Sequence, residues 1–217
     1  MNQTSPGETD GRLIRGLQTR ELILSRAVDI ASVDGLEGLS IGRLALDLDL
    51  SKSGLFAHFG SKEDLQIAVI GTAVEIFTSR VTARALKTPP GVRRVWRLAQ
   101  AWLEYSKGRT FPGGCFFRAA ASEFNSKPGR VRDVIAEAQR SWIDLYEQSI
   151  REARDAGELN PGTNPARLAF ELDALAVLAD LRSGLFDDDA PYQLASSAVL
   201  ARLRDNCPDP HLLPARS

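Results

Sequence analysis

Residues 39–65, LSIGRLALDLDLSKSGLFAHFGSKEDL, hold the signals for two short helices and the start of a third. Ser40 is a residue of the type that begins helices, and apolar side chains follow it at helical spacing as far as Leu48. Ser51 can cap a second helix over residues 52–59, in which Leu55 and Phe59 lie four apart on one face. The pattern therefore predicts two short helices separated by a tight turn.

The end of the same stretch predicts where the second helix stops and a third begins. Gly60 suits a helix C-terminus, and Ser61-Lys62-Glu63-Asp64 reads as a capping box with an aspartate at its acidic position. Two short helices joined by a tight turn, the second presenting polar and basic side chains, are the outline of a helix-turn-helix DNA reader.

Residues 50–65, LSKSGLFAHFGSKEDL, resemble the recognition region of the TetR/AcrR family of transcriptional regulators, which runs roughly x-S-K-x-x-L-Y-x-H-F-x-S-K-E-x-L. Most of the specified positions agree in order and spacing, and the resemblance covers about residues 17–70. It implies a homodimeric regulator that binds a near-palindromic operator in double-stranded DNA. It also implies a small-molecule effector, bound in a C-terminal helical bundle, and repression that the effector releases.

The candidate DNA contacts lie in and around this reader. A major-groove reader needs hydrogen-bonding side chains at the N-terminal end of its recognition helix, and phosphate contacts at its edges. The residues that suit these roles are Thr19, Arg20, Ser40, Lys52, Ser53, Gly54, Phe56, His58 and Lys62. Phe56 stands where the family commonly has a tyrosine, so it cannot donate a bond to phosphate. Gly54 stands where the family often has a hydroxyl residue, so it loses a possible contact, and it loosens the helix by roughly 1 kcal/mol relative to alanine.

Charge and composition narrow the function classes. Residues 1–70 hold seven Lys and Arg side chains against ten Asp and Glu, which argues against a purely electrostatic DNA binder. No apolar run reaches membrane-spanning length and the N-terminus lacks a signal peptide's apolar core, so a cytoplasmic protein is expected. The two cysteines lie far apart without a Cys/His cluster, and we expect neither a metal site nor a cofactor.

Helical periodicity continues through the rest of the chain, and no strand signal interrupts it. We therefore predict an all-α fold of about nine helices: a three-helix helix-turn-helix domain followed by a helical domain for ligand binding and dimerisation. The expected division is a disordered arm, the DNA-binding domain, the ligand-binding and dimerisation domain, and a tail, over residues 1–16, 17–65, 66–206 and 207–217.

Aromatic side chains are concentrated in the middle of the chain. Most of them are expected to be ordinary core, but an effector pocket lined by apolar groups with a few polar ones would draw on the same set. The candidate pocket residues are Trp102, Tyr105, Phe116, Phe117, Arg118, Trp142 and Tyr146, with Glu123 as a second polar candidate. They favour an apolar or aromatic effector.

The last two predicted helices are rich in leucine and alanine, which permits close helix packing. Such helices could form the interior of one bundle or the interface of a two-fold dimer, and the family resemblance favours the dimer. The candidate interface residues are Leu172, Leu175, Ala179, Leu194, Ala198 and Ala201.

Cys115 follows Gly113-Gly114 at a predicted helix start, where it could be a reactive sensor or an inert core thiol. Two other functions stay open: an enzyme that uses Cys115 as its nucleophile, and a helical ligand-binding or adaptor protein whose reader has lost DNA binding. Enzymatic fingerprints are absent, and the histidines, His58 and His211, lie in the reader and the tail. We therefore expect no catalytic site.

Overall fold

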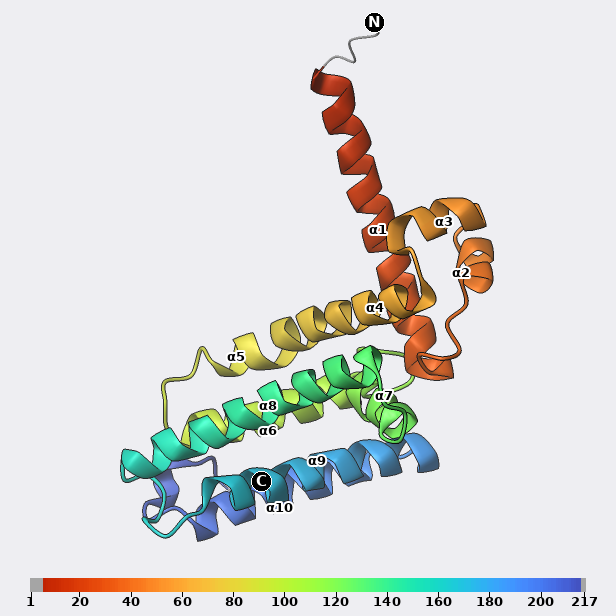
Figure 1. The fold of residues 1–217 in the computed structure, drawn as a ribbon. Helices are drawn as coiled ribbons and strands as arrows, with labels where there is room; N and C mark the ends of the chain where they lie inside the picture. Colours follow the sequence, from red (N-terminus) through yellow and green to blue (C-terminus); the bar gives the residue numbers. More distant parts are fainter. Residues whose placement is uncertain (1–5, 216–217) are drawn as a thin grey trace, which may run out of the picture.

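The positions of the helices follow the sequence pattern closely. The computed structural model describes residues 6–215, and within that range the predicted all-α fold is confirmed (Figure 1). The helices are α1 (Pro6–Asp34), α2 (Ile41–Asp47), α3 (Lys52–Phe59), α4 (Lys62–Phe77), the π-helical η1 (Thr78–Thr82), α5 (Ala83–Ala85), α6 (Val92–Lys107), α7 (Phe116–Phe124), α8 (Arg130–Asp155), α9 (Pro165–Phe186), α10 (Ala190–Asp205) and the 3₁₀ turn η2 (Pro210–Leu212). Because α4, η1 and α5 form one continuous rod, residues 6–205 make nine helical rods, as predicted.

The first helix is longer than predicted. We expected a disordered arm over residues 1–16, but α1 begins at Pro6 and projects away from the bundle (Figure 1). Residues 1–5 lie outside the described part. Pro6 is compatible with a first helical turn, where its missing N–H is not needed. Propagating a helix costs less than nucleating one, so the buried segment from Ile23 onward can support this extension.

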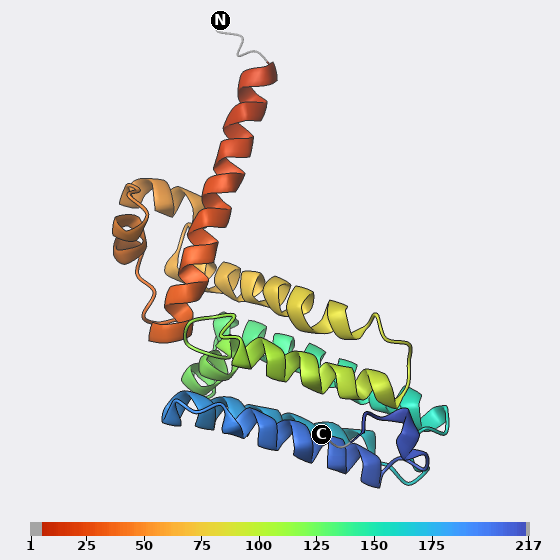
Figure 2. The same cartoon turned by 180° about the vertical axis from the view of Figure 1, so that it is seen from behind.

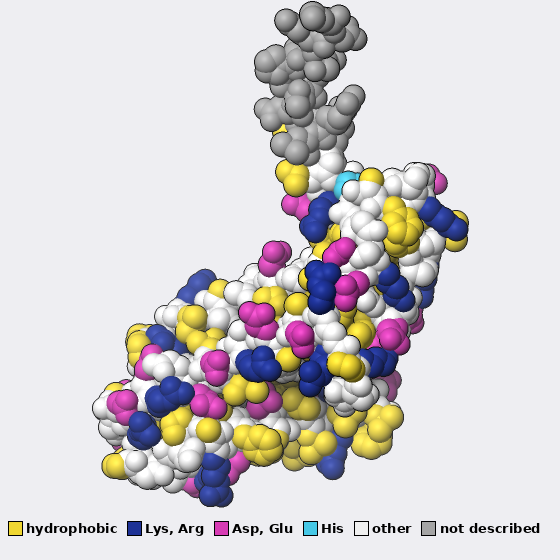
Figure 3. Space-filling view, viewed as in Figure 1, with side chains coloured by type: hydrophobic (Ala, Val, Ile, Leu, Met, Phe, Trp, Pro, Cys, Tyr) yellow, Lys and Arg dark blue, Asp and Glu magenta, His cyan; other side chains and the backbone are white. Residues whose placement is uncertain are grey.

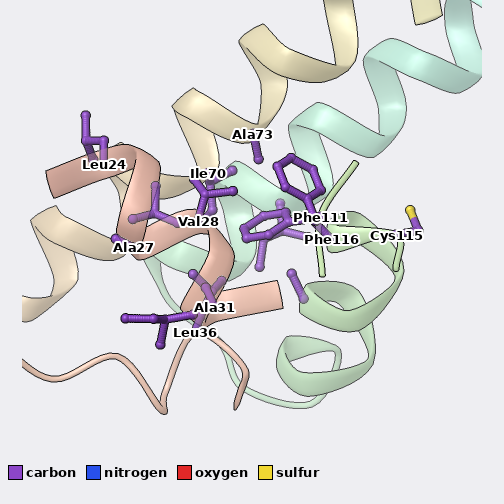
Figure 4. Packing of buried hydrophobic residues seen from close by; sticks show 14 of the residues in the cluster. Leu24, Ala27, Val28, Ala31, Leu36, Ile70, Ala73, Phe111, Cys115 and Phe116 are labelled. Carbon is purple, nitrogen blue, oxygen red and sulfur yellow. The ribbon is translucent and has the colours of Figure 1, made fainter. Parts of the chain in front are cut away.

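The reader and the bundle share one hydrophobic core. Val28 of α1, Ile70 of α4 and Phe116 of α7 belong to a single cluster of buried side chains, seen close up in Figure 4. The predicted boundary after residue 65 falls inside α4 rather than in a linker, because Leu65 and Val69 are both fully buried in that cluster. A shift of α4 or α7 would therefore change the packing of the side chains that α1 buries in the same cluster.

A second core holds the far end of the bundle together. It joins α6, α8, α9 and α10, which stack in layers on the side away from α1 (Figure 2). The predicted tail is part of this core: Leu213 is buried, and the Leu212 carbonyl accepts a hydrogen bond from Arg93 Nε at 2.7 Å. The apolar pair of leucines explains why the chain stays packed past Pro210. Among the described helices, none is both long and apolar enough to cross a membrane.

Candidate nucleic-acid interface and effector cavity

Three serines fix where the helices of the reader begin. The Oγ of each accepts a hydrogen bond from the backbone N–H three residues later, at 3.1 Å for Ser40 and Ser51 and at 3.0 Å for Ser61. Each cap satisfies a helix N–H that would otherwise lack a partner. Ser40, a predicted DNA contact, thus starts α2 while its side chain stays exposed.

Helix α3 has one buried face and one open face. Leu55 and Phe59 are buried against the other reader helices. Lys52 and Ser53 are exposed at its N-terminal end, and Phe56 is 49% exposed. The exposed Phe56 ring offers an apolar contact for a base methyl or a sugar. Of the residues predicted to read DNA, Lys52, Ser53 and Phe56 are therefore exposed together on α3.

Gly54 lies directly against the cap of α3. A Cβ at this position would stand 3.0 Å from Ser51 Oγ, which is tight for the hydroxyl that accepts the Gly54 N–H at 3.1 Å. Alanine would favour the helix more than glycine does, but its Cβ would press on the Ser51 hydroxyl that caps α3. This gives a structural reason for glycine here.

Ion pairs engage several carboxylates of the reader, some with cations of the reader itself and others with a cation of the bundle. Asp34 pairs with Arg43 and Asp47 with Arg26, while Arg130 of α8 lies 3.0 Å from Glu63. Lys52 takes part in none of the ion pairs found in residues 6–215, and its charge at the start of α3 is free to meet a phosphate.

Two predicted DNA contacts outside α3, Lys62 and Arg20, make contacts within the reader. The Lys62 ammonium donates to the Glu37 carbonyl at 2.6 Å, tying the α1–α2 loop to α4 instead of standing free for DNA. The Arg20 guanidinium lies 5.2 Å from the centre of the Phe59 ring, a cation–π contact that joins α1 to α3. Thr19 is half-buried beside it, and His58 is half-buried with its ring 6.2 Å from that of Phe59.

A cavity of about 540 Å³ opens between the long α4 rod and helices α6 to α9. Of the predicted pocket residues, Trp102, Phe117, Arg118 and Trp142 line it. The π-helical turn η1 lies along its edge, since Thr78 and Thr82 are both among the lining residues. Its volume is within the range of sites for small organic molecules.

The other predicted pocket residues lie behind the wall. Tyr105 and Phe116 are buried in the core around Phe111, and Tyr146 is buried beneath Trp142 with ring centres 5.2 Å apart. Their burial is complete without a ligand, so they support the lining rings instead of contacting the cavity. Glu123 also faces away, because its carboxylate accepts hydrogen bonds from backbone groups of the α1–α2 loop.

Comparison with known proteins places both halves of the chain in one family. Residues 23–69 match the family described as bacterial regulatory proteins, tetR family, and residues 91–199 match the tetracyclin repressor-like C-terminal domain. The chain belongs to the TetR family of transcriptional regulators. It is therefore a helix-turn-helix DNA-binding regulator, and its family is not one of enzymes, as the sequence predicted.

Individual TetR-family relatives are distant in sequence and close in fold. The HTH-type transcriptional regulator YezE of Bacillus subtilis is 24% identical over 140 residues, which are 64% of this chain and 72% of YezE. A TetR regulator from Chloroflexus aurantiacus superposes with a TM-score of 0.83 at 22% identity, covering 89% of this chain and 98% of that one. AibR, solved with isovaleryl coenzyme A and operator DNA, gives 0.67 at 19% identity, over 87% of this chain and 98% of AibR.

Sequence reasoning missed several residues of the cavity in this TetR-family chain. Phe77 of α4 faces the rings of Phe117 and Trp142 edge-on, with centroids 5.8 and 5.2 Å away. Asp173 of α9 accepts a hydrogen bond from Trp142 Nε1 at 3.0 Å, and burial raises the pKa of its carboxyl. A polar residue inside the apolar pattern of α9 was the signal that could have revealed Asp173.

Asp180 of α9 ties three helices together beneath the cavity. Its carboxylate is buried, and it accepts hydrogen bonds from Ser106 Oγ, from Arg118 Nε and from the Cys115 backbone N–H. Arg118 is thus held against the wall by an ion pair with a side chain that is only 2% exposed. Much of its charge is compensated before any ligand arrives.

The Cys115 thiol is buried, although its residue lines the cavity. Burial raises its pKa to about 12, and the nearby Asp180 carboxylate adds to the effect. A reactive thiol needs the opposite environment, one that favours the thiolate. The environment supports the core-thiol interpretation over the sensor and nucleophile interpretations.

The outer face of α9 and α10 differs from the predicted interface. Leu172 and Ala179 are buried inside the subunit, so they are unavailable to a second chain, whereas Leu194 is 67% exposed. Figure 3 shows hydrophobic side chains gathered over α9. The large apolar residues exposed on these two helices are Phe170, Leu178, Leu181, Leu185, Phe186 and Leu194.

Proposed function

We propose that this TetR-family regulator is a ligand-responsive repressor that binds a near-palindromic operator as a homodimer, with α3 of each subunit in the major groove. The observation that carries the proposal is the open face of α3, where Lys52, Ser53 and Phe56 are exposed while Leu55 and Phe59 anchor the helix from behind. This is the arrangement by which a recognition helix presents side chains to base edges and phosphates. Such a regulator acts in the cytoplasm, where its operator lies.

Dimerisation is supported by the exposed apolar face of α9 and α10. Leu185 and Phe186 are 72% and 64% exposed, which is costly for single large side chains in water and is relieved when a second copy covers them. A palindromic operator requires two readers about 34 Å apart, and a two-fold axis at this face would supply the pair.

Ligand response is supported by helix α7, which contacts both sites. At its N-terminal end Phe117 and Arg118 line the cavity. Near its C-terminal end, Glu123 accepts hydrogen bonds from the backbone N–H groups of Leu36 and Glu37, at 2.8 and 2.9 Å. A ligand that moves α7 must therefore move the loop that leads into α2, and with it the reader. The solved complex of AibR with an acyl-coenzyme A and operator DNA supports the same two-site organisation here.

The test is a gel-shift titration of the purified protein on the DNA upstream of its own gene. Lys52→Ala should weaken binding, and it should reduce the slope of log K against log salt by about 0.9, the value for one lost phosphate contact. Lys87→Ala is the matched control, because Lys87 is an exposed lysine on the far loop after α5. Equal affinity and equal salt slope for both variants would refute the placement of α3. Failure of the wild-type protein to select any sequence from a random DNA pool would refute the function and favour a reader that has lost DNA binding.

A further inference from the structure

The cavity is walled by aromatic rings that meet at steep angles. The Phe77 ring is nearly perpendicular to those of Phe117 and Trp142, at 82° and 85°, and Trp102 adds a further ring to the lining. Aromatic rings in several orientations therefore line one space, and a ring face that meets a guest there is electron-rich. This favours a bulky apolar body, and it favours positive charge on that body.

The acidic and basic side chains that line the cavity differ in whether another side chain of the protein already pairs with their charge. Arg118 is the basic side chain of the lining and is already neutralised by the buried Asp180. Asp173 has one neutral partner, Trp142 Nε1, and no second partner is found for it within residues 6–215. Glu137 of α8 also lines the cavity, and none of the hydrogen bonds or ion pairs of the described chain involves its carboxylate. The lining therefore carries an excess of negative charge.

These two features discriminate between classes of ligand. An anion would be repelled by the carboxylates of Asp173 and Glu137. It would gain little from Arg118, which is already paired with Asp180. A neutral apolar guest would expel water from Asp173 and leave its charge without compensation, which is costly in a low-dielectric site. A cation would pair with Asp173 inside the cavity and with Glu137 at its open side.

We propose that the cavity binds a hydrophobic organic cation, whose apolar groups contact the aromatic rings and whose charge is paired with Asp173 and Glu137. Its regulatory meaning rests on the proposed function, in which occupancy of the cavity shifts α7 and releases operator. The cation binding itself does not depend on that function. Asp173 is the residue that selects charge, because it lines the cavity beside the Trp142 indole and has no cationic partner within residues 6–215.

The experiment uses three probes of similar shape and different charge on the full-length protein. Tetraphenylphosphonium, triphenylphosphine oxide and tetraphenylborate are titrated while tryptophan fluorescence is followed, since Trp102 and Trp142 lie in the wall. The phosphonium cation is expected to bind about tenfold more tightly, or more, than the neutral oxide, a difference of about 1.4 kcal/mol, and the borate most weakly. Equal or tighter binding of the borate or the oxide would overturn the proposal, as would the failure of the phosphonium to bind.

Substitutions of the two acidic side chains test whether they are responsible for the preference for a cation. Asp173→Asn should weaken phosphonium binding about tenfold while changing oxide binding less than about twofold, and Glu137→Gln should have a smaller effect in the same direction. Asp144→Asn is the matched control, because Asp144 is an exposed acid of the same α8 outside the cavity. A phosphonium affinity that Asp173→Asn leaves unchanged would overturn the assignment, and the comparison of wild-type probes stands even if that variant folds poorly.

The same samples separate this inference from the proposed function. Operator binding measured without any probe tests the reader alone. If the protein binds operator but shows no preference for the cation, the cation inference is refuted and the proposed function stands. If the protein prefers the cation but binds no DNA, the assignment of the cavity stands and the proposed function is refuted.

Discussion

The Glu123 carboxylate joins the cavity helix α7 to the α1–α2 loop, and a single substitution can test whether this contact couples the two sites. Its oxygens accept the N–H groups of Leu36 and Glu37 at 2.8 and 2.9 Å, in a half-buried position. Hydrogen bonds to a charged group contribute about 1.5–3 kcal/mol each. Glutamine keeps one acceptor oxygen and turns its NH₂ toward the second N–H, so Glu123→Gln should lose one of the two bonds. Because water can reach this site, we expect a loss of about 1–2 kcal/mol in the free energy of unfolding.

Urea denaturation measures that loss, and gel shift with and without effector measures its functional consequence. We expect Glu123→Gln to bind operator more weakly and to respond less to effector, because α7 then holds the α1–α2 loop by one of these hydrogen bonds instead of two. Glu104→Gln is the control: its ion pair with Arg84 is exposed and long at 3.9 Å, so its removal should cost less than about 0.5 kcal/mol. If Glu123→Gln keeps wild-type stability and a full effector response, the coupling does not pass through this carboxylate.

Three further outcomes are expected. Asp180→Ala should lower the free energy of unfolding by about 3–5 kcal/mol in urea denaturation, because it leaves the Arg118 charge without its buried partner; a change below about 1 kcal/mol would contradict this. Leu185→Asp should shift the protein toward monomer in sedimentation velocity, since Leu185 is 72% exposed on the proposed interface, and an unchanged dimer would place the interface elsewhere. In a Cys207→Ser background, Cys115 should react slowly with a thiol reagent at neutral pH, and the rate should rise about tenfold per pH unit up to pH 9. The reason is that the thiolate fraction grows about tenfold per pH unit below a pKa of about 12. Rapid labelling at pH 7 would instead favour the sensor interpretation.

The reader was predictable because its signals are local. Ser51, Leu55, Phe59 and Gly60 lie within ten residues, and each specifies a cap, a buried face or a helix end by its own chemistry. The roles of Lys62 and Glu123 were not predictable in this way. Their partners lie in the α1–α2 loop, and only the tertiary fold brings a lysine or glutamate to those particular backbone groups.

The cavity was predictable in part for a related reason. Aromatic side chains mark an apolar region, but core and lining share the same composition, so Trp142 and Tyr146 could not be separated by type. Four positions apart on α8, they lie on one face at different depths, with Trp142 reaching the cavity and Tyr146 packed below it. Depth depends on which helices pack on that face, and a periodic pattern does not contain this information.

Helix α9 shows what such a pattern does contain. Leu172 is fully buried in the subunit while Leu178 and Leu185 are 43% and 72% exposed, yet all three are leucines of one helix. A helix that is apolar on more than one side is expected to be covered on more than one side. The subunit covers the side of α9 that holds Leu172 and leaves the side that holds Leu185 open. The proposed dimer accounts for these extra leucines, because a two-fold pairing of this face would cover them and would also bring two copies of α3 to one operator.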